Sequence, residues 1–170
     1  MLAGGDLNKI IIDGYNLIHR VPELAKYIEV SLERARDELL RLLKSYTMSK
    51  QVEIIVAFDG QQPPLGIDAP YDTRRLKVRF SRQPFKADPM IKNMIASAAK
   101  PKSVAVVTDD GDIRRFAVSK RASVISSPDF FHLLIKRSER KAADQSRDHN
   151  MSEDELAEWL KLFEEGGTSE

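Results

Sequence analysis

Cysteine is absent from this chain of 170 residues, which excludes a disulfide framework, a thiolate metal site and a cysteine nucleophile. A reducing compartment is compatible with that absence. Neither sign of charge dominates, because 27 Lys and Arg residues are offset by 26 Asp and Glu residues and leave a net charge of +1. This balance argues neither for a generally cationic nucleic-acid binder nor for an acidic protein, so any charge signal must be local.

Long hydrophobic runs are also missing. No stretch approaches the roughly 18 consecutive apolar residues that a bilayer-spanning helix requires. The N-terminus, MLAGGDLNK, lacks the basic segment followed by an apolar run that is typical of a secretory signal. We therefore expect a soluble, cytoplasmic protein that does not bind a membrane.

Several common catalytic motifs are absent as well. No glycine-rich phosphate loop follows the first apolar run, and the spacing of a serine-hydrolase elbow does not occur. The histidines, His19, His132 and His149, are far apart and match no zinc-site spacing. An aspartyl-phosphate enzyme would place a second aspartate two residues after Asp13, where this chain has Tyr15.

Short β-branched runs that end in turn residues predict strands at 9–13, 52–60, 103–111 and 122–126. Nearly continuous hydrophobicity is typical of parallel strands that are buried on both faces. Apolar residues at helical spacing lie between these runs, in two stripes. The stripes are Leu32, Ala35, Leu39, Leu42 and Leu43, and Ile91, Met94, Ile95 and Ala98. The alternation predicts a three-layer α/β/α sandwich with a mainly parallel sheet.

The run RRLKVRF at 74–80 has a different pattern, because basic and apolar residues alternate along it. Such a strand suits the edge of a sheet, where charge discourages aggregation. Six basic residues and no acidic residue occur between positions 74 and 87. They are Arg74, Arg75, Lys77, Arg79, Arg82 and Lys86. Two interpretations of this basic segment are open: a solvent-exposed sheet edge, or a surface that contacts RNA.

The C-terminal part is strongly charged after Phe131. We expect a domain at 1–140, a charged linker at 141–151 and an amphipathic helix at 152–164. Ser152 and Glu155 have capping-box spacing at the start of that helix. Its apolar stripe would pack back on the domain or an identical subunit, or dock on a partner protein.

Aspartates follow each of the three longest apolar runs. Asp13 ends the first, Asp59 the second, and Asp109, Asp110 and Asp112 follow the third. The carboxyl ends of neighbouring parallel strands form one edge of the sheet, where ligands bind, so these acids should converge. Clustered carboxylates repel one another unless a cation neutralises them. Without His or Cys companions they favour Mg²⁺ or Mn²⁺.

Each aspartate also has a structural explanation. Asp13 and Asp59 each precede a glycine, as turn residues do. Asp88 before Pro89 resembles an N-cap followed by the first helical residue, and Asp110 can cap the next helix. Capping alone does not explain three acids within five residues.

The motifs together resemble the YacP-like NYN domains of the PIN-like nuclease superfamily. The matching segments are IIIDGYNLIH, VAFDG, KADPMIKNMI, VVTDDGDIRRFA and ASVISSPDFFHLL, which occur in the family's order over roughly residues 9–135. Asp109 stands where the family often has a small polar residue, and Pro89 where an ordinary helix former is more usual. Either Asp109 or Asp110 can therefore supply the ligand.

The resemblance implies a metal-dependent ribonuclease site. Its catalytic residues would be Asp13, Asn16, Asp88 and Asp110, with Asn16 orienting Asp13 or a metal-bound water. Its metal ligands would come from Asp13, Asp59, Asp88, Asp110 and Asp112. Its RNA-binding residues would be the six basic residues of the 74–87 segment, and Tyr15, Phe80 or Phe85 would stack a base, although Phe80 also suits the core.

Three functions follow as hypotheses. The first is an endoribonuclease that uses Mg²⁺ or Mn²⁺ to hydrolyse single-stranded or ribosome-associated RNA with metal-activated water. The second is a catalytically inactive PIN-like module that binds RNA or protein. The third is a flap-type DNA nuclease. The chain lacks the long additional helical regions of those enzymes, which argues against this hypothesis.

Overall fold

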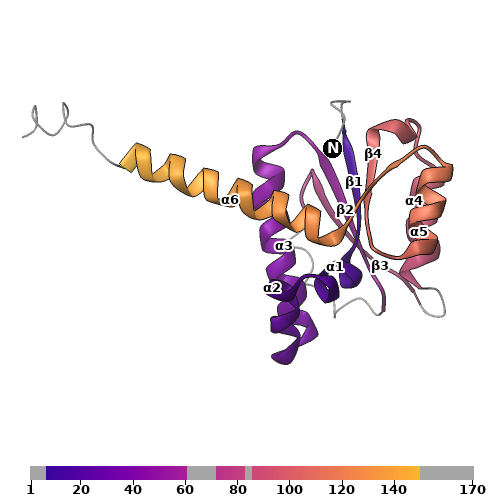
Figure 1. Ribbon diagram of the computed structural model, residues 1–170, viewed down its shortest axis with the longest axis horizontal. Coiled ribbons are helices and arrows are strands. Elements are labelled where there is room, and N and C mark those ends of the chain that lie inside the picture. Colours follow the sequence, from indigo (N-terminus) through magenta and orange to yellow (C-terminus); the bar gives the residue numbers. More distant parts are fainter. Residues whose placement is uncertain (1–6, 61–71, 83–85, 150–170) are drawn as a thin grey trace, which may run out of the picture. The chain divides into compact units, whose positions relative to one another are not determined.

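Residues 7–60, 72–82 and 86–149 are described in the computed structural model (Figure 1). Five parallel strands form one sheet in the order β3-β2-β1-β4-β5. The strands are β1 (Lys9–Asp13), β2 (Glu53–Phe58), β3 (Leu76–Phe80), β4 (Val104–Val107) and β5 (Ser123–Ile125). Each predicted strand is confirmed, and the three strands with terminal acids are neighbours, with β1 in the centre.

Helices and short 3₁₀ turns follow β1, β3, β4 and β5 along the chain. They are α1 (Gly14–Arg20), α2 (Pro22–Ala25), the 3₁₀ turn η1 (Lys26–Glu29), α3 (Leu32–Ser49), α4 (Ala87–Ala96), the 3₁₀ turn η2 (Pro101–Ser103), α5 (Gly111–Ser119) and α6 (Ser127–His149). The α3 helix starts where the Ser31 hydroxyl accepts a hydrogen bond from the Arg34 backbone N–H at 3.0 Å.

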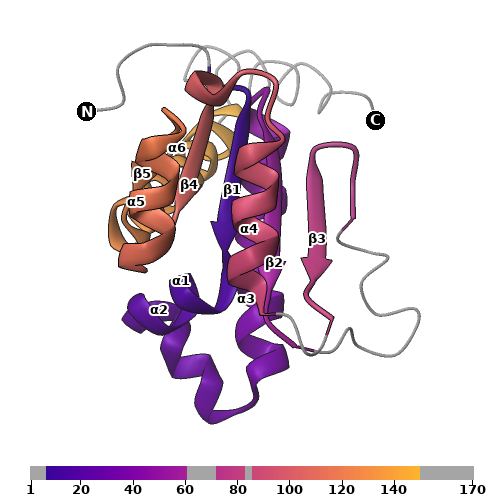
Figure 2. The same ribbon diagram turned by 90° about the vertical axis from the view of Figure 1, so that its right-hand side faces the viewer.

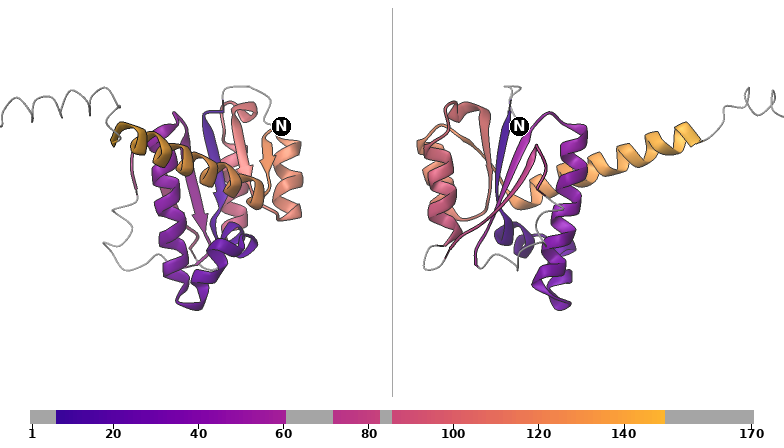
Figure 3. Two further views of the ribbon diagram at one scale, coloured as in Figure 1. Left: turned by 60° about the vertical axis from the view of Figure 1, so that its left-hand side comes forward. Right: turned by 180° about the vertical axis from the view of Figure 1, so that it is seen from behind.

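The sheet is covered by helices on both faces, which confirms the predicted α/β sandwich (Figures 2 and 3). The sheet has one hydrophobic core on each face. Successive side chains of β1 point to opposite faces, so Ile10 and Ile12 pack in the core with α3, and Ile11 packs in the core with α4 and α5. None of these isoleucines is more than 4% exposed. Each contributes about 1.5–3 kcal/mol by burial, so β1 needs apolar residues in succession.

The basic run forms the edge strand β3, as predicted. Leu76 and Val78 are buried, whereas Arg79 is exposed. The alternation spreads the basic residues along the strand, and Arg75 and Arg79 lie roughly 13 Å apart at the usual strand rise. Arg75 precedes β3 at the amino edge of the sheet, and its guanidinium donates to the Lys50 carbonyl oxygen at 3.4 Å.

The helix α6 extends through most of the predicted linker. Its first turns contribute Phe130 and Leu134 to the core, and the helix continues to His149. Good helix formers and the absence of Gly and Pro between positions 136 and 149 explain this continuation. Residues 1–135 and 136–170 form separate compact units. The predicted helix at 152–164 lies outside the described residues.

In the part of the chain that the structure describes, none of the helices has the length and hydropathy needed to cross a membrane. The predicted cytoplasmic location stays a prediction.

Candidate active site

Thr108 joins the ends of the two central strands. Asp13 is the last residue of β1, and Thr108 directly follows β4, the neighbouring strand. The fully buried Thr108 hydroxyl donates to Asp13 Oδ2 at 3.2 Å and accepts from the Asp110 backbone N–H at 3.1 Å. One hydroxyl therefore sets the positions of two of the predicted acids.

Asn16 forms a second link between the same strand ends. Its backbone N–H lies near the Asp13 carboxylate and lowers the pKa of that acid, without forming a capping hydrogen bond to it. Its side-chain Oδ1 accepts from the Asp109 backbone N–H at 2.9 Å, across 93 positions of sequence. Asn16 thus holds the α1 helix against the turn that follows β4.

Burial raises the pKa of Asp13 to about 6 from its usual value of 3.8. The hydrogen bond from Thr108 opposes this shift, and the nearby negative charges of Asp110 and Asp88 add to it. The interaction shows that three of the predicted acids, from three separate segments, lie within electrostatic reach of one another. Asp13 and Asp110, which follow neighbouring strands as predicted, are therefore within electrostatic reach of each other, and Asp13 is also within reach of Asp88 on α4.

Asp88 is the second residue of α4, which begins at Ala87, two positions before the expected start at Pro89. The interpretation of Asp88 as an N-cap is therefore wrong, because Lys86 occupies that position. Asp88 Oδ2 lies 3.5 Å from Lys92 Nζ, one turn further along α4. Asp88 Oδ1 is buried and has no hydrogen-bond partner. An unpaired buried carboxylate oxygen is costly, so this atom is open to a cation.

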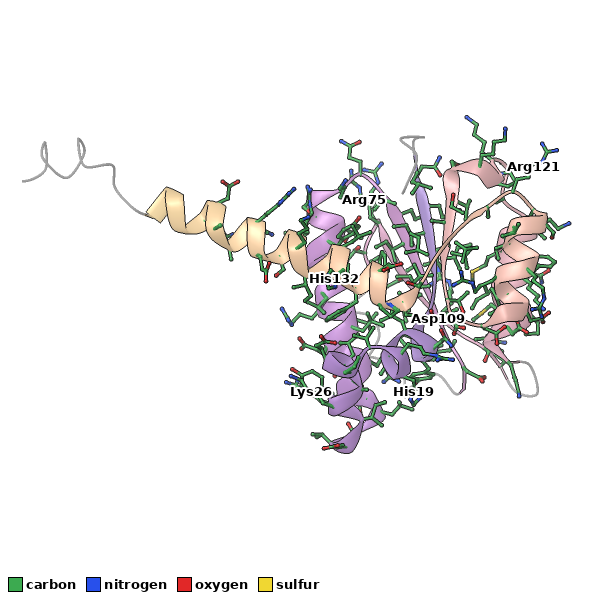
Figure 4. The ribbon with its side chains drawn as sticks, viewed as in Figure 1. His19, Lys26, Arg75, Asp109, Arg121 and His132 are labelled. Carbon is green, nitrogen blue, oxygen red and sulfur yellow. The ribbon has the colours of Figure 1, made fainter. Side chains whose placement is uncertain are left out.

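Asp109 and Asp110 point to different partners. Asp109 Oδ2 accepts from the backbone N–H of Ser127 at 3.1 Å and so fixes the start of α6 (Figure 4). Asp110 Oδ1 caps α5 by accepting from the backbone N–H groups of Asp112 and Ile113 at 2.9 and 3.1 Å. The predicted cap is confirmed, and Asp110 is the one of the two that raises the pKa of Asp13.

The other two predicted ligands have their own partners. Asp59 is exposed, and its Oδ1 accepts from the Ser81 hydroxyl at 3.1 Å. Asp112 forms ion pairs with Lys92 and Arg115, and the hydrogen bond from Lys92 lowers its pKa. Among the described residues, no hydrogen bond or ion pair joins either acid to Asp13.

The basic residues do not gather at the acids. Figure 4 shows Asp109 at the edge where the strands end, and Arg75 toward the opposite end of the sheet. Arg79 lies near the carboxyl end of β3, where it pairs with Asp72 at 3.6 Å. Arg74, Arg82 and Lys86 are exposed. Phe80 packs against the core as expected, while Phe85 lies outside the described residues.

A model of the YacP-like NYN domain matches residues 10–164, which is most of the chain. The protein belongs to the YacP-like NYN domain family. NYN domains are part of the PIN-like nuclease superfamily, which supports a nuclease or RNA-related role.

Individual relatives agree with this assignment. The chain is 29% identical over 85 residues to the uncharacterised protein YacP of Bacillus subtilis (strain 168), a match that spans 50% of this chain and 49% of that one. The chain thus spans about half the length of this curated relative. Two crystal structures of Rae1 (YacP) from Bacillus subtilis share the fold. The first, a variant, has a TM-score of 0.71 at 21% identity over 85% of both chains, and the second 0.66 at 25% identity over 92% of both.

PIN-like nucleases typically use divalent metal ions. The acids of this candidate site, called the NYN site below, can be compared with the ligands that such an ion requires. Within residues 7–60, 72–82 and 86–149, no three His, Cys, Asp or Glu side chains are close enough to hold an ion as placed. Their separate partners account for this arrangement, because Asp88 pairs with Lys92, Asp110 caps α5 and Asp13 accepts from Thr108. The donor set nevertheless fits a hard divalent cation, because it consists of carboxylate oxygens and includes the orphaned Asp88 Oδ1.

Sequence reasoning missed Thr108 and Lys92 of the NYN site. Lys92 Nζ lies between Asp88 and Asp112, and its ion pairs join α4 to α5. Its position one helical turn after Asp88 was an available signal. Thr108 directly precedes the Asp109–Asp110 pair, but its contact with Asp13 spans 95 positions and required the sheet order.

The raised pKa of Asp13 predicts a pH-dependent stability. The folded state binds this proton more tightly than the unfolded state, so the contribution of Asp13 to stability is most favourable below pH 4 and is lost as pH rises to about 6. The loss amounts to at most about 3 kcal/mol. It is measured as the difference in urea unfolding free energy between the wild type and Asp13→Asn without divalent ions. A difference that stays constant from pH 4 to 7 would contradict the assignment.

Proposed function

We propose that this NYN domain is an endoribonuclease that depends on Mg²⁺ or Mn²⁺ and hydrolyses phosphodiester bonds of RNA. The observation that supports it best is that Asp88 and Asp110 lie within electrostatic reach of Asp13, with the buried Asp88 Oδ1 left without a partner. Strand ends of open parallel sheets are where such folds bind their ligands.

Asp13, Asp88 and Asp110 would hold the ion. When bound, it would neutralise the charge of the phosphodiester and supply an activated water. The chain's own groups prepare this arrangement. Thr108 orients Asp13, and Asn16 keeps the two strand ends at a constant separation. No side-chain nucleophile is required.

The RNA would approach from the β3 edge. Arg79, Arg82 and Lys86 belong to the carboxyl part of the basic segment, next to the start of α4 and Asp88. Their charges would bind phosphates without reading bases. Arg74, Arg75 and Lys77 would extend that contact along the strand. Single-stranded or ribosome-associated RNA is the substrate expected from the sequence.

A non-catalytic RNA-binding or protein-binding module is the second candidate. One observation favours it: Lys92 already compensates Asp88 and Asp112, and Asp110 acts as a helix cap, so part of the cluster is satisfied without an ion.

Adjacent aspartates allow a matched test of the proposal. We expect Asp110→Asn to lower Mn²⁺-dependent cleavage of labelled RNA by about a hundredfold or more, because a carboxylate that stabilises charge in the transition state is worth several kcal/mol. Asparagine caps helices as well as aspartate does, so the fold should persist. Asp109→Asn is the control and should stay within a few-fold of wild type, because its amide oxygen can still accept from Ser127.

Cleavage would be followed with Mg²⁺, Mn²⁺ or EDTA, on RNA and on DNA of the same sequence. Wild-type protein that cleaves neither, or Asp110→Asn that cleaves as fast as wild type, would reject the endoribonuclease in favour of the binding module. Cleavage of DNA alone would support the flap-type alternative.

A further inference from the structure

Arg36 of α3 is a charged side chain in the interior, with only 7% of its surface exposed. None of the ion pairs among the described residues includes it. Burial raises the pKa of neighbouring Asp37, and Arg36 partly opposes that shift, yet the two do not form an ion pair. A buried cation without a carboxylate partner is costly, so its retention calls for a physical reason.

The contacts of Arg36 are with aromatic side chains. Its guanidinium carbon lies 5.4 Å from the ring centre of Phe80 and 6.0 Å from that of Phe58. Its Nη1 donates to the Tyr15 hydroxyl at 3.4 Å, near the upper limit for a hydrogen bond. Cation–π contact offsets part of the desolvation cost. It leaves most of the five guanidinium N–H donors unused.

The unused donors are not all fully buried. The buried side-chain atoms of the described residues that lack a hydrogen-bond partner are Asp88 Oδ1 and Ser127 Oγ. The remaining Arg36 nitrogens, which have no partner either, are therefore not fully enclosed. The guanidinium is therefore largely buried with some exposed surface, and a guanidinium can bind a phosphate through two parallel N–H groups.

The position of Arg36 relates it to the acids. Phe58 and Phe80 are the last residues of β2 and β3 and are paired in register, and Tyr15 is two residues after Asp13. The guanidinium is thus near the carboxyl edge of the sheet, on the α3 face of β2 and β3. Asp13 follows Ile12 and alternates toward the α4 face, so an RNA strand that contacts both groups has to cross this edge. At the usual strand spacing, β2 and β3 lie roughly 5 and 10 Å from β1.

We propose that Arg36 binds an internal phosphodiester of the RNA strand next to the one that is cleaved, and so guides the strand from the β3 edge across β2 to Asp13. The inference rests on the proposed function and adds a substrate subsite to it. Tyr15, Phe58 and Phe80 hold the guanidinium in place. In this role Arg36 determines binding and position rather than the chemical step.

The test compares Arg36→Met with Arg41→Met. Both residues are arginines of α3, but Arg41 is exposed and pairs with Glu38. The probe is a single-stranded RNA with a 5′-hydroxyl and a 3′-fluorophore, so that it carries internal phosphodiesters and no terminal phosphate. Binding is measured in EDTA over a range of salt concentrations, and thermal unfolding is recorded for each variant.

We expect Arg36→Met to weaken binding by roughly 10- to 100-fold, because a charge-assisted hydrogen bond is worth about 1.5–3 kcal/mol. The slope of log affinity against log salt should fall by about 0.7, the value for one phosphate of a single strand. Arg41→Met should change neither. In the cleavage assay with metal, Arg36→Met should raise KM more than it lowers kcat.

Arg36→Lys provides a second measure if the methionine variant does not fold. It keeps the charge but lacks the fork, so affinity should fall at least about fivefold with an unchanged salt slope. Wild-type affinity in Arg36→Lys, or a lower melting temperature with an unchanged slope in Arg36→Met, would overturn the subsite.

The two proposals fail separately. If the wild type cleaves RNA but Arg36→Met binds and cleaves normally, the subsite is wrong and the nuclease stands. If the wild type binds RNA without cleaving it and Arg36→Met loses the binding, the subsite stands and the nuclease is wrong.

Discussion

Asp13→Asn is expected to lower metal-dependent RNA cleavage by about a thousandfold while making the protein without metal more stable than wild type. The loss follows because Asp13 is the central acid of the cluster, and removing several kcal/mol of charge stabilisation slows the reaction by about that factor. The gain follows because ionised Asp13 is half-buried beside Asp88 and Asp110, which raises its pKa. Relief of the desolvation cost, which is the larger cause, and of the repulsion contributes at most about 3 kcal/mol at pH 7.

A substitution that lowers activity but raises stability identifies a functional acid, whereas replacing a structural acid would lower stability. Initial cleavage rates in Mn²⁺ and urea unfolding in EDTA give the two quantities. Asn at position 13 can still accept the Thr108 hydrogen bond, so the strand ends should stay joined. Added Mn²⁺ should stabilise the wild type more than the variant, by about 2.7 kcal/mol for the wild type at a concentration 100 times Kd. A variant that is both active and less stable would show that Asp13 is a structural residue.

Gly14→Ala is expected to destabilise the fold by about 3 kcal/mol, despite the higher helix propensity of alanine. A Cβ atom at position 14 would lie 2.4 and 2.6 Å from two carbons of the Phe58 ring. That ring is fully buried, stacks on Phe80 at a centroid distance of 5.5 Å and contacts Tyr15 at 4.8 Å, so it has little room to move. Gly14 is therefore required for close packing, and its φ is not positive.

Gly111→Ala is the matched control, because both glycines begin a helix. Its new Cβ would meet only the flexible end of Arg115, at 3.1 Å, and stability should change by less than about 0.5 kcal/mol. Thermal unfolding of the two variants measures the difference, expected at about 6–12 °C. The double variant with Phe58→Leu should recover part of the loss. Equal melting temperatures for both single variants would contradict the packing role.

The two predictions concern neighbouring residues and test different physics. Asp13 is costly to the fold because it is charged, whereas Gly14 is necessary to it because it is small. Gly14→Ala should also reduce cleavage, since a shift of α1 would move Asn16 away from the Asp109 backbone N–H. In that case activity and stability fall together, unlike the result expected for Asp13→Asn.

Much of the fold was predictable because its signals are local. Apolar runs such as Ile10–Ile12 followed by an acid define buried strands and their ends, and alternation in the run at 74–80 marked the edge strand. Helix ends were less predictable. Most of the apolar residues expected to face the sheet from α3 and α4 are buried. Leu32 is 42% exposed, because it is the first residue of α3 and lies beyond the part of the helix that contacts the sheet.

The sequence by itself determined the parallel sheet and the delivery of Asp13 and Asp110 to one edge, because apolar runs that alternate with helical segments form strands with the same direction, whose carboxyl ends share one edge. Only the tertiary structure decided which acids meet. Asp109 and Asp110 are adjacent, yet Asp109 accepts from Ser127 whereas Asp110 caps α5 and raises the pKa of Asp13. Thr108 reaches Asp13 across 95 positions. The burial of Arg36 against Phe58 and Phe80 is equally non-local, since no pattern within α3 reveals which strand ends the Arg36 guanidinium will contact.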